Sequence, residues 1–224
     1  QAASLTLVVI IALLAIVQGG VILKTKYNSA LNTGLHMMYG ASAVNNLANP
    51  AEEQWFTQNV DHFDQQNTET YQQRYFVNDT FYKPGGPVFF MLGGEGPEAA
   101  SSVAGYFIMN YYASFFNGFI VALEHRFYGK SLPKPDLSTE SLKYLSSQQA
   151  IADAAVFRQF LVQKYKFSPD TKFVVVGGSY SGNLAAWTRA KYPHLFDISL
   201  GTSGPVLAVE NFPEYMDVVA KSLG

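Results

Sequence analysis

The segment at residues 174–187, with the sequence VVVGGSYSGNLAAW, limits the fold of this chain more than any other part. Its three valines predict a buried strand, two glycines end that strand, and a run typical of a helix follows the serines. Glycines permit the close backbone approach that a tight strand-to-helix turn requires. We therefore expect an α/β fold in which a serine stands between a central strand and the N-terminus of a helix.

This arrangement is typical of a nucleophile elbow, a turn that lifts a serine oxygen clear of the sheet. Free N–H groups at the helix N-terminus favour a developing negative charge at the same point. Ser179 fits better than Ser181, because Gly177 lies two residues before it and a small residue lies two residues after it. We predict Ser179 as the nucleophile and the Tyr180 amide as an oxyanion donor. A phosphate-binding loop is disfavoured, because neither a Gly-Lys-Ser/Thr ending nor a G-x-G-x-x-G pattern is present.

From about residue 54 the chain alternates between predicted strands and helices, which is typical of a doubly wound, mostly parallel sheet. The predicted strands are residues 71–77, 87–92, 119–123, 172–176 and 198–202. The predicted helices are residues 98–116, 142–165, 182–192 and 212–223. Continuous apolar strands indicate a sheet covered on both faces. Residues Ala150, Ala154, Phe157 and Leu161 share one face of the longest predicted helix.

A second glycine-rich loop, GGEG at residues 93–96, follows the predicted strand at residues 87–92. In α/β-hydrolases the loop after the third strand supplies one oxyanion N–H group, and the residue after the nucleophile supplies the other. We therefore predict that Gly94 or Glu95 provides the second donor. The loop alone is weak evidence and gains weight only from its pairing with the elbow.

The predicted strand at residues 119–123 ends in three ionisable residues, Glu124, His125 and Arg126. His125 precedes the serine in the chain, whereas α/β-hydrolases have the order Ser, Asp or Glu, then His, so His125 is not the expected base. We expect Glu124 and Arg126 to form a charged network that shapes the pocket, with a structural ion pair as an equally supported alternative. The remaining histidines, His36, His62 and His194, are expected to be structural or exposed.

The composition excludes several function classes. Charged residues are 14% of the chain, against about 25% in an average domain, and the formal net charge is −2 with no basic run. A nucleic-acid partner is therefore not expected. The chain has no cysteine, which excludes a disulfide scaffold, a thiolate zinc site and a cysteine nucleophile. No metal-ligand cluster and no cofactor motif is seen, so no cofactor is expected.

Residues 2–23 carry no charge and contain the apolar run LTLVVIIALLAIV at residues 5–17. This run has the length of a signal-peptide core, but the whole segment is long enough to span a bilayer. We expect a signal peptide, with a membrane anchor as the alternative, followed by a linker at residues 24–53 and a catalytic domain at residues 54–224. Both alternatives place that domain outside the cytosol, where Asn78, followed by Asp79 and Thr80, is a predicted glycosylation site.

Together these segments resemble the serine peptidases that include lysosomal Pro-X carboxypeptidase, dipeptidyl peptidase II and thymus-specific serine protease. The resemblance rests on GGSYSG with LAAW, on EHRFYG at residues 124–129, and on DHF at residues 61–63 with QRYFVND at residues 73–79. The GGEG loop looks most like the thymus-specific branch. The resemblance implies an α/β-hydrolase fold with a helical insertion and a Ser–Asp–His triad. It also implies a secreted or lysosomal enzyme that cleaves short peptides near a terminus, often after proline.

Carried over to this chain, the resemblance makes Ser179 the acylated nucleophile and gives the oxyanion to Tyr180 N–H and the loop at Gly94 and Glu95. The acid and base of that family lie late in the chain, yet no histidine follows His194 here. The later acidic residues are Asp197, Glu210, Glu214 and Asp217, all too early in the topology. We therefore expect an N-terminal fragment with an incomplete sheet, inactive alone because a serine without a base is a poor nucleophile.

Two other functions stay open at this point. One is an esterase or lipase on the same fold, and the other is a catalytically inactive, membrane-tethered homologue used for binding. For the peptidase the expected partner is a peptide substrate. The sequence sets no oligomeric state.

Overall fold

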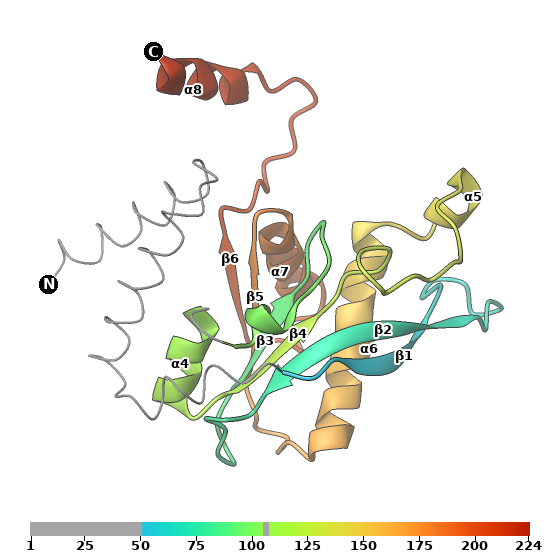
Figure 1. The fold of residues 1–224 in the computed structure, drawn as a ribbon, viewed down its shortest axis with the longest axis vertical. Coiled ribbons are helices and arrows are strands. Elements are labelled where there is room, and N and C mark those ends of the chain that lie inside the picture. Colours follow the sequence, from blue (N-terminus) through green and yellow to red (C-terminus); the bar gives the residue numbers. More distant parts are fainter. Residues whose placement is uncertain (1–50, 105–107) are drawn as a thin grey trace, which may run out of the picture.

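The computed structural model describes residues 51–104 and 108–224, which build a six-stranded mixed sheet with helices against both faces (Figure 1). The strand order is β1-β2-β4-β3-β5-β6. The bounds are β1 (Gln54–Asn59), β2 (Thr70–Asn78), β3 (Val88–Leu92), β4 (Phe119–Leu123), β5 (Phe173–Gly178) and β6 (Ile198–Thr202). Strands β3 to β6 are parallel to one another, whereas β2 runs antiparallel to both β1 and β4. The predicted α/β class and the mostly parallel sheet are confirmed.

The helical segments are η1 (Ala100–Ser102), α4 (Ile108–Phe116), α5 (Thr139–Leu142), α6 (Ser147–Tyr165), α7 (Tyr180–Lys191) and α8 (Pro213–Leu223). Helix α4 packs on one face of the sheet, and α6 and α7 pack on the other. The face of α6 predicted from its spacing is buried, with Phe157 and Leu161 fully inaccessible. The Phe157 ring contacts the rings of Tyr75 and Phe90 on two strands. Burial of such side chains stabilises the fold by about 1.5–3 kcal/mol each.

Several predicted boundaries differ from those of the structure, and one strand was missed. In the described part of the helix predicted at residues 98–116, Glu98 and Ala99 are not helical and Ala100–Ser102 form η1, because the Glu98 backbone is drawn into a buried hydrogen-bond network. Helix α6 begins at Ser147 and not at residue 142, since the Ser146 side chain caps it by accepting from the Gln149 N–H. The Ser-x-x-Gln spacing was a readable signal for this start. Strand β1 was missed, because QWFTQN has no β-branched pattern beyond one threonine.

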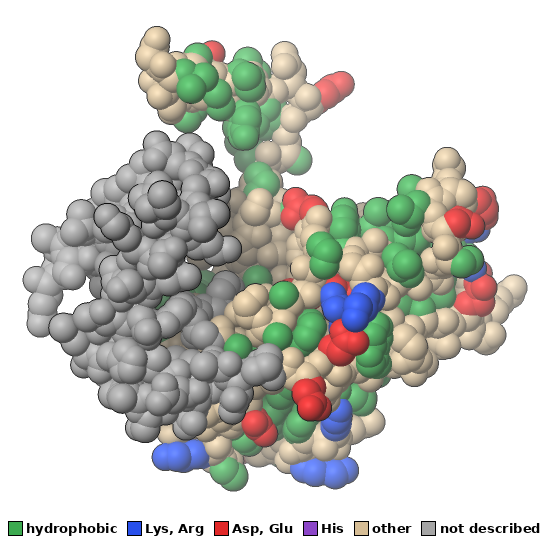
Figure 2. Space-filling view, in the orientation of Figure 1, with side chains coloured by type: hydrophobic (Ala, Val, Ile, Leu, Met, Phe, Trp, Pro, Cys, Tyr) green, Lys and Arg blue, Asp and Glu red, His purple; other side chains and the backbone are tan. Residues whose placement is uncertain are grey.

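The last strand and the last helix are more exposed than predicted. Strand β6 was expected to be covered, yet Ile198 is 54% exposed and Leu200 is 36% exposed. Helix α8 stands apart from the sheet with no buried residue among its members (Figure 1). Its apolar side chains include Tyr215, Met216 and Val218, which are all exposed. Hydrophobic side chains cover much of this helix at the top of the space-filling view (Figure 2).

The predicted leader and most of the predicted linker fall at residues 1–50, outside the described residues. Within residues 51–104 and 108–224, no helix has the length and apolar character needed to cross a bilayer.

A buried charge network joins the end of β4 to α6 and to Asn59 and Val60 at the end of β1. Arg126 is fully inaccessible, and its Nε and Nη2 donate to the two oxygens of the Asp153 carboxylate at 2.7 and 2.6 Å. Its remaining donors go to three backbone carbonyls, of Asn59, Val60 and Tyr144. All five guanidinium donors are thus used. Asp153 also accepts from Tyr71 and contacts His62, so the buried carboxylate is fully surrounded by donors.

We predict that Asp153→Asn destabilises the protein by about 3–5 kcal/mol, because it leaves the Arg126 charge buried without a counter-charge. Urea unfolding of the complete protein at pH 7 measures this loss. Glu140→Gln is the matched control, since it removes an exposed ion pair with Lys143 and should cost less than about 1 kcal/mol. Equal losses for the two variants would contradict the prediction.

The same pair should make stability depend on pH. Burial opposes ionisation of Asp153, but the charge and hydrogen bonds of Arg126 outweigh it and hold the pKa below its ordinary 3.8. A carboxylate with a lowered pKa contributes stability above its unfolded pKa and loses it as pH falls further. The stability gap between wild type and Asp153→Asn should therefore be constant from pH 7 to about 5 and narrow below 3.8. Urea titrations across this range test the trend, and a gap that widens toward acid would overturn it.

Candidate active site

The turn between β5 and α7 holds Ser179 in an unusual backbone conformation. Its φ is 55° and its ψ is −130°, a combination that residues with a side chain seldom adopt. Such strain costs about 1–3 kcal/mol and persists only where the surroundings fix it. The turn leaves the Ser179 side chain exposed at the end of a buried strand. This is the geometry that the sequence predicted for a nucleophile elbow.

Backbone hydrogen bonds and close contacts fix the turn. The Ser179 N–H donates to the Thr202 carbonyl of β6 at 3.0 Å, and the Ser179 carbonyl accepts from the Gly182 N–H at 2.9 Å. A Cβ at Gly177 would overlap the Ser181 carbonyl, and one at Gly182 would lie 2.8 Å from the Thr202 oxygen. Only glycine therefore lets β5, α7 and β6 approach closely enough to form this turn.

Ser181 is occupied by the turn itself. Its side chain is buried, and its hydroxyl donates to the Gly178 carbonyl and accepts from the Gly178 N–H, both at 2.9 Å. The second serine thus ties the first turn of α7 back to the end of β5. This explains why serine replaces the usual glycine two residues after Ser179, and it favours Ser179 as the accessible hydroxyl.

Two backbone N–H groups near Ser179 are candidates for an oxyanion hole. Tyr180 is the first residue of α7, so its N–H has no acceptor within the helix. The loop after β3 lies alongside, because a Cβ built on Gly94 would be 3.7 Å from the Ser181 Cβ. Glu95, the next residue, is exposed. The structure thus brings the elbow and the GGEG loop together, while the donor roles of Tyr180, Gly94 and Glu95 stay predictions.

Glu124 anchors the far end of that loop. Its carboxylate is fully inaccessible and accepts from Arg74 Nη2 at 2.5 Å and from the Glu98 N–H at 2.9 Å. The Arg74 guanidinium also donates to the Glu98 carbonyl at 2.9 Å. The other Glu124 oxygen accepts from the Lys130 N–H and the Ser131 hydroxyl. The loop at residues 93–98 is therefore held at its end by a buried ion pair.

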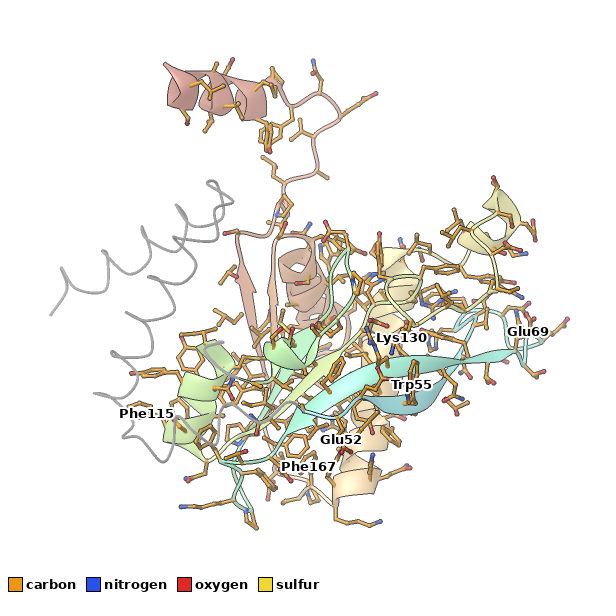
Figure 3. The ribbon with its side chains drawn as sticks, viewed as in Figure 1. Glu52, Trp55, Glu69, Phe115, Lys130 and Phe167 are labelled. Atoms are coloured by element: carbon orange, nitrogen blue, oxygen red, sulfur yellow. The ribbon has the colours of Figure 1, made fainter. Side chains whose placement is uncertain are left out.

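The charged cluster after β4 is two networks and not one. Glu124 pairs with Arg74, whereas Arg126 gives all its donors to Asp153 and to carbonyls. Glu124 and Arg126 therefore do not share a network: both follow the end of β4 at Leu123, and each forms a structural ion pair with a different element, β2 or α6. Their pocket-shaping role stays a prediction. Lys130, labelled in Figure 3, reaches the residue before β1, where its ammonium lies 2.8 Å from Glu53.

Arg74 and Glu98 are two site-supporting residues that sequence reasoning missed. The readable signal for Arg74 was a charged residue inside a predicted strand, because a charge that becomes buried in a sheet needs a partner. Burial raises the pKa of Glu98 above its ordinary value, although its hydrogen bonds to Ser102 and Ala99 oppose the shift.

His125 contacts Tyr180 and the main chain. Its Nε2 is 3.1 Å from the Tyr180 hydroxyl, and its Nδ1 is 2.7 Å from the Arg126 carbonyl oxygen. Burial lowers the pKa of His125 below 6.5, with the charge of Arg126 acting in the same direction. Both ring nitrogens are therefore used, and the expectation that His125 is not the general base stays a prediction.

The other predicted histidines lie apart from Ser179. His62 is buried with its Nε2 2.7 Å from Asp153, so it belongs to the network beneath α6. His194 is exposed beyond the C-terminus of α7, which is about 18 Å from its N-terminus at 1.5 Å per residue. Asp197 accepts from the Phe173 N–H at the opposite end of β5 from Ser179. His36 lies outside the described residues.

An apolar cavity of about 260 Å³ lies on the α4 side of β5 and β6. Its lining residues are Met91, Ile108, Val176, Gly177, Gly178, Ser181, Leu200 and Thr202. Ser179 is not among these residues, although its neighbours Gly178 and Ser181 are. In the described part of the chain, no three His, Asp or Glu side chains gather in a way that would hold a metal ion.

The glycosylation predicted at Asn78 stays a prediction. The Asn78 side-chain nitrogen donates to the Val103 carbonyl at 2.7 Å and to the Asn110 side chain at 3.1 Å. A glycan on this nitrogen would replace one of these inward hydrogen bonds, so modification requires a local change of conformation.

The sequence matches the family model described as serine carboxypeptidase S28 over residues 58–224. A putative serine protease of Caenorhabditis elegans, K12H4.7, is 50% identical over 170 residues, covering 75% of this chain and 33% of that protein. The human thymus-specific serine protease is 38% identical over 200 residues, covering 88% of this chain and 37% of that protein. A probable extracellular serine carboxypeptidase of Arthroderma benhamiae is 35% identical over 172 residues, covering 71% and 24%. The chain thus spans about a third of the length of the first two relatives.

We predict that Gly177→Ala destabilises the protein by about 1–3 kcal/mol, because its methyl group forces α7 away from β5. Urea unfolding of the complete protein measures the change. Gly96→Ala is the stability control, since no atom lies within 4 Å of a Cβ at that position. Equal stability of Gly177→Ala and wild type would contradict the close approach described above.

We also predict that Ser179→Ala abolishes labelling of the complete protein by a fluorophosphonate, because the label bonds to the nucleophilic oxygen. Ser181→Ala should keep the label and lose about 1 kcal/mol of stability, from its hydrogen bonds to Gly178. Gel fluorescence and urea unfolding measure the two effects. Labelling that depends on Ser181 and not on Ser179 would show that the roles are reversed.

Proposed function

The chain belongs to the serine carboxypeptidase S28 family, and from that membership we propose that it supplies the nucleophile and the oxyanion hole of a serine-type peptidase. The observation that carries this proposal is the exposed Ser179 hydroxyl, held in a strained turn at the N-terminus of α7. The strand order and the position of the turn after β5 support an α/β-hydrolase fold.

In the proposed reaction, Ser179 Oγ attacks the carbonyl carbon of a peptide bond while a general base takes its proton. The negative charge that forms on the carbonyl oxygen is stabilised by the Tyr180 N–H and by an N–H of the loop at Gly94 and Glu95. Collapse of the intermediate breaks the C–N bond, and the base returns the proton to the leaving amine. Water then hydrolyses the acyl-enzyme by the same steps.

We propose that the base and the acid that orients it come from sequence beyond the residues seen here. The surroundings of the three described histidines support this. His125 and His62 are engaged elsewhere, and His194 lies at the far end of α7. The greater length of the relatives also supports it. We therefore propose that the present chain is inactive alone. We also propose that its sheet is incomplete and that β6 is an edge strand to which further strands would add.

The finer assignment is exopeptidase action on short peptides, near a terminus and with preference for proline. Its support is the resemblance of the sequence motifs and the printed names of two relatives, a thymus-specific serine protease and a probable extracellular serine carboxypeptidase. We propose a secreted or lysosomal location on the same basis, together with the uncharged segment at residues 2–23.

We predict that the complete protein hydrolyses a proline-containing dipeptide amide and that Ser179→Ala reduces kcat by at least about 10³-fold, leaving only the binding and oxyanion contributions. A chromogenic amide and a short-chain ester are assayed side by side. Turnover of the ester alone would favour an esterase. No turnover and no fluorophosphonate labelling would favour an inactive binding homologue.

A further inference from the structure

A hydrogen bond joins the residue after the proposed nucleophile to a histidine on another strand end. The Tyr180 hydroxyl lies 3.1 Å from His125 Nε2. His125 follows β4, which is separated from β5 by β3 in the sheet. The contact therefore bridges two elements that meet only at the carboxyl edge of the sheet, and neither the elbow motif nor the family assignment requires it.

The direction of this hydrogen bond follows from the second ring nitrogen. His125 Nδ1 lies 2.7 Å from the Arg126 carbonyl oxygen, and a carbonyl only accepts, so Nδ1 carries the proton. In the neutral ring Nε2 then has a lone pair and accepts from the Tyr180 hydroxyl. Burial lowers the pKa of His125 and raises that of Tyr180 to about 12, so both groups are neutral near pH 7.

The His125 imidazole is buried and packed against two aromatic rings. It is 4% exposed, and its ring centroid lies 5.1 Å from that of Tyr128 and 5.6 Å from that of Tyr180. The next residue, Arg126, is fully inaccessible and saturated with acceptors. A side chain hydrogen-bonded to His125 is thus attached to a buried and fully hydrogen-bonded part of the sheet edge.

Tyr180 is in turn the residue whose backbone N–H is the proposed oxyanion donor. We propose that His125 is a positioning residue that holds the Tyr180 ring through its hydroxyl and so orients the Tyr180 N–H toward the oxygen of the tetrahedral intermediate. This inference rests on the proposed function. It explains why a buried histidine is placed near the elbow although it is not the base.

Loss of a whole oxyanion donor reduces kcat by about 10²–10³-fold. A donor that is present but misoriented should therefore reduce the rate by less, about tenfold. The orientation matters only when negative charge develops. It should therefore affect the rate of acylation and leave the binding of the unreacted ligand unchanged.

The test is a double-mutant cycle in the complete protein, read as kinact and KI for a fluorophosphonate. The variants are Tyr180→Phe, which removes only the hydroxyl, and His125→Phe, which keeps a ring without an acceptor. Each should lower kinact about tenfold with KI unchanged, and the pair should lower it no further than either alone. Multiplied effects of about 100-fold, or an unchanged kinact in Tyr180→Phe, would overturn the inference.

Two further variants separate positioning from general packing. His125→Gln keeps a neutral acceptor and a donor for the Arg126 carbonyl, so it should restore kinact to within about threefold of wild type. Tyr128→Phe removes the hydroxyl of the other ring beside His125 and should leave kinact unchanged. If Tyr128→Phe slows labelling as much as Tyr180→Phe does, the hydrogen bond is not the cause. If His125→Phe does not fold, His125→Leu, which also lacks an acceptor, takes its place in the cycle.

Failure of this inference is distinguishable from failure of the proposed function. Labelling that depends on Ser179 with additive His125 and Tyr180 effects keeps the nucleophile and removes the positioning role. Labelling that does not depend on Ser179 removes the proposed function, and the positioning role with it.

Discussion

The close backbone approach at the β5–α7 turn is the constraint on which the site depends. Gly177 and Gly182 have no room for a side chain against Ser181 and Thr202, and Gly201 would meet the Gly182 carbonyl. These contacts hold Ser179 at a positive φ with its hydroxyl exposed. This close approach fixes the positions of the α7 N-terminus, the Thr202 carbonyl of β6 and the loop after β3. The strain at Ser179 is therefore balanced by packing among β5, α7 and β6.

Two buried ion pairs organise the rest of the carboxyl edge. The Glu124–Arg74 pair fixes the end of the loop that carries Gly94, and the Arg126–Asp153 pair joins β4 to α6. Both carboxylates have several donors, which is the condition under which buried charges are tolerated. Between Glu124 and Arg126 lies His125, whose imidazole faces Tyr180. The three consecutive residues thus contact side chains on three different elements, Arg74 on β2, Tyr180 on α7 and Asp153 on α6.

Much of the fold was readable because strand and helix periods are local. The strands at residues 119–123 and 198–202 have the predicted bounds, and the buried face of α6 follows from its spacing. The failures have physical reasons. Strand β1 is stabilised by its pairing with β2 and by α6 rather than by its own composition. The helix expected from residue 98 is displaced because Glu98 makes better hydrogen bonds to the buried Glu124 and Arg74.

The sequence by itself was enough to predict the elbow, to favour Ser179 over Ser181 and to argue against His125 as the base, because these predictions depend on residue size, spacing and chain order. Only the tertiary structure decided that the Ser181 hydroxyl is hydrogen-bonded to Gly178 and that His125 reaches Tyr180. It also decided that Glu124 and Arg126 belong to separate networks. Partners far apart in sequence are chosen by the geometry of the sheet edge, where strand ends that are distant along the chain become neighbours. A pattern of residue types along the chain does not show which of these neighbours a side chain contacts.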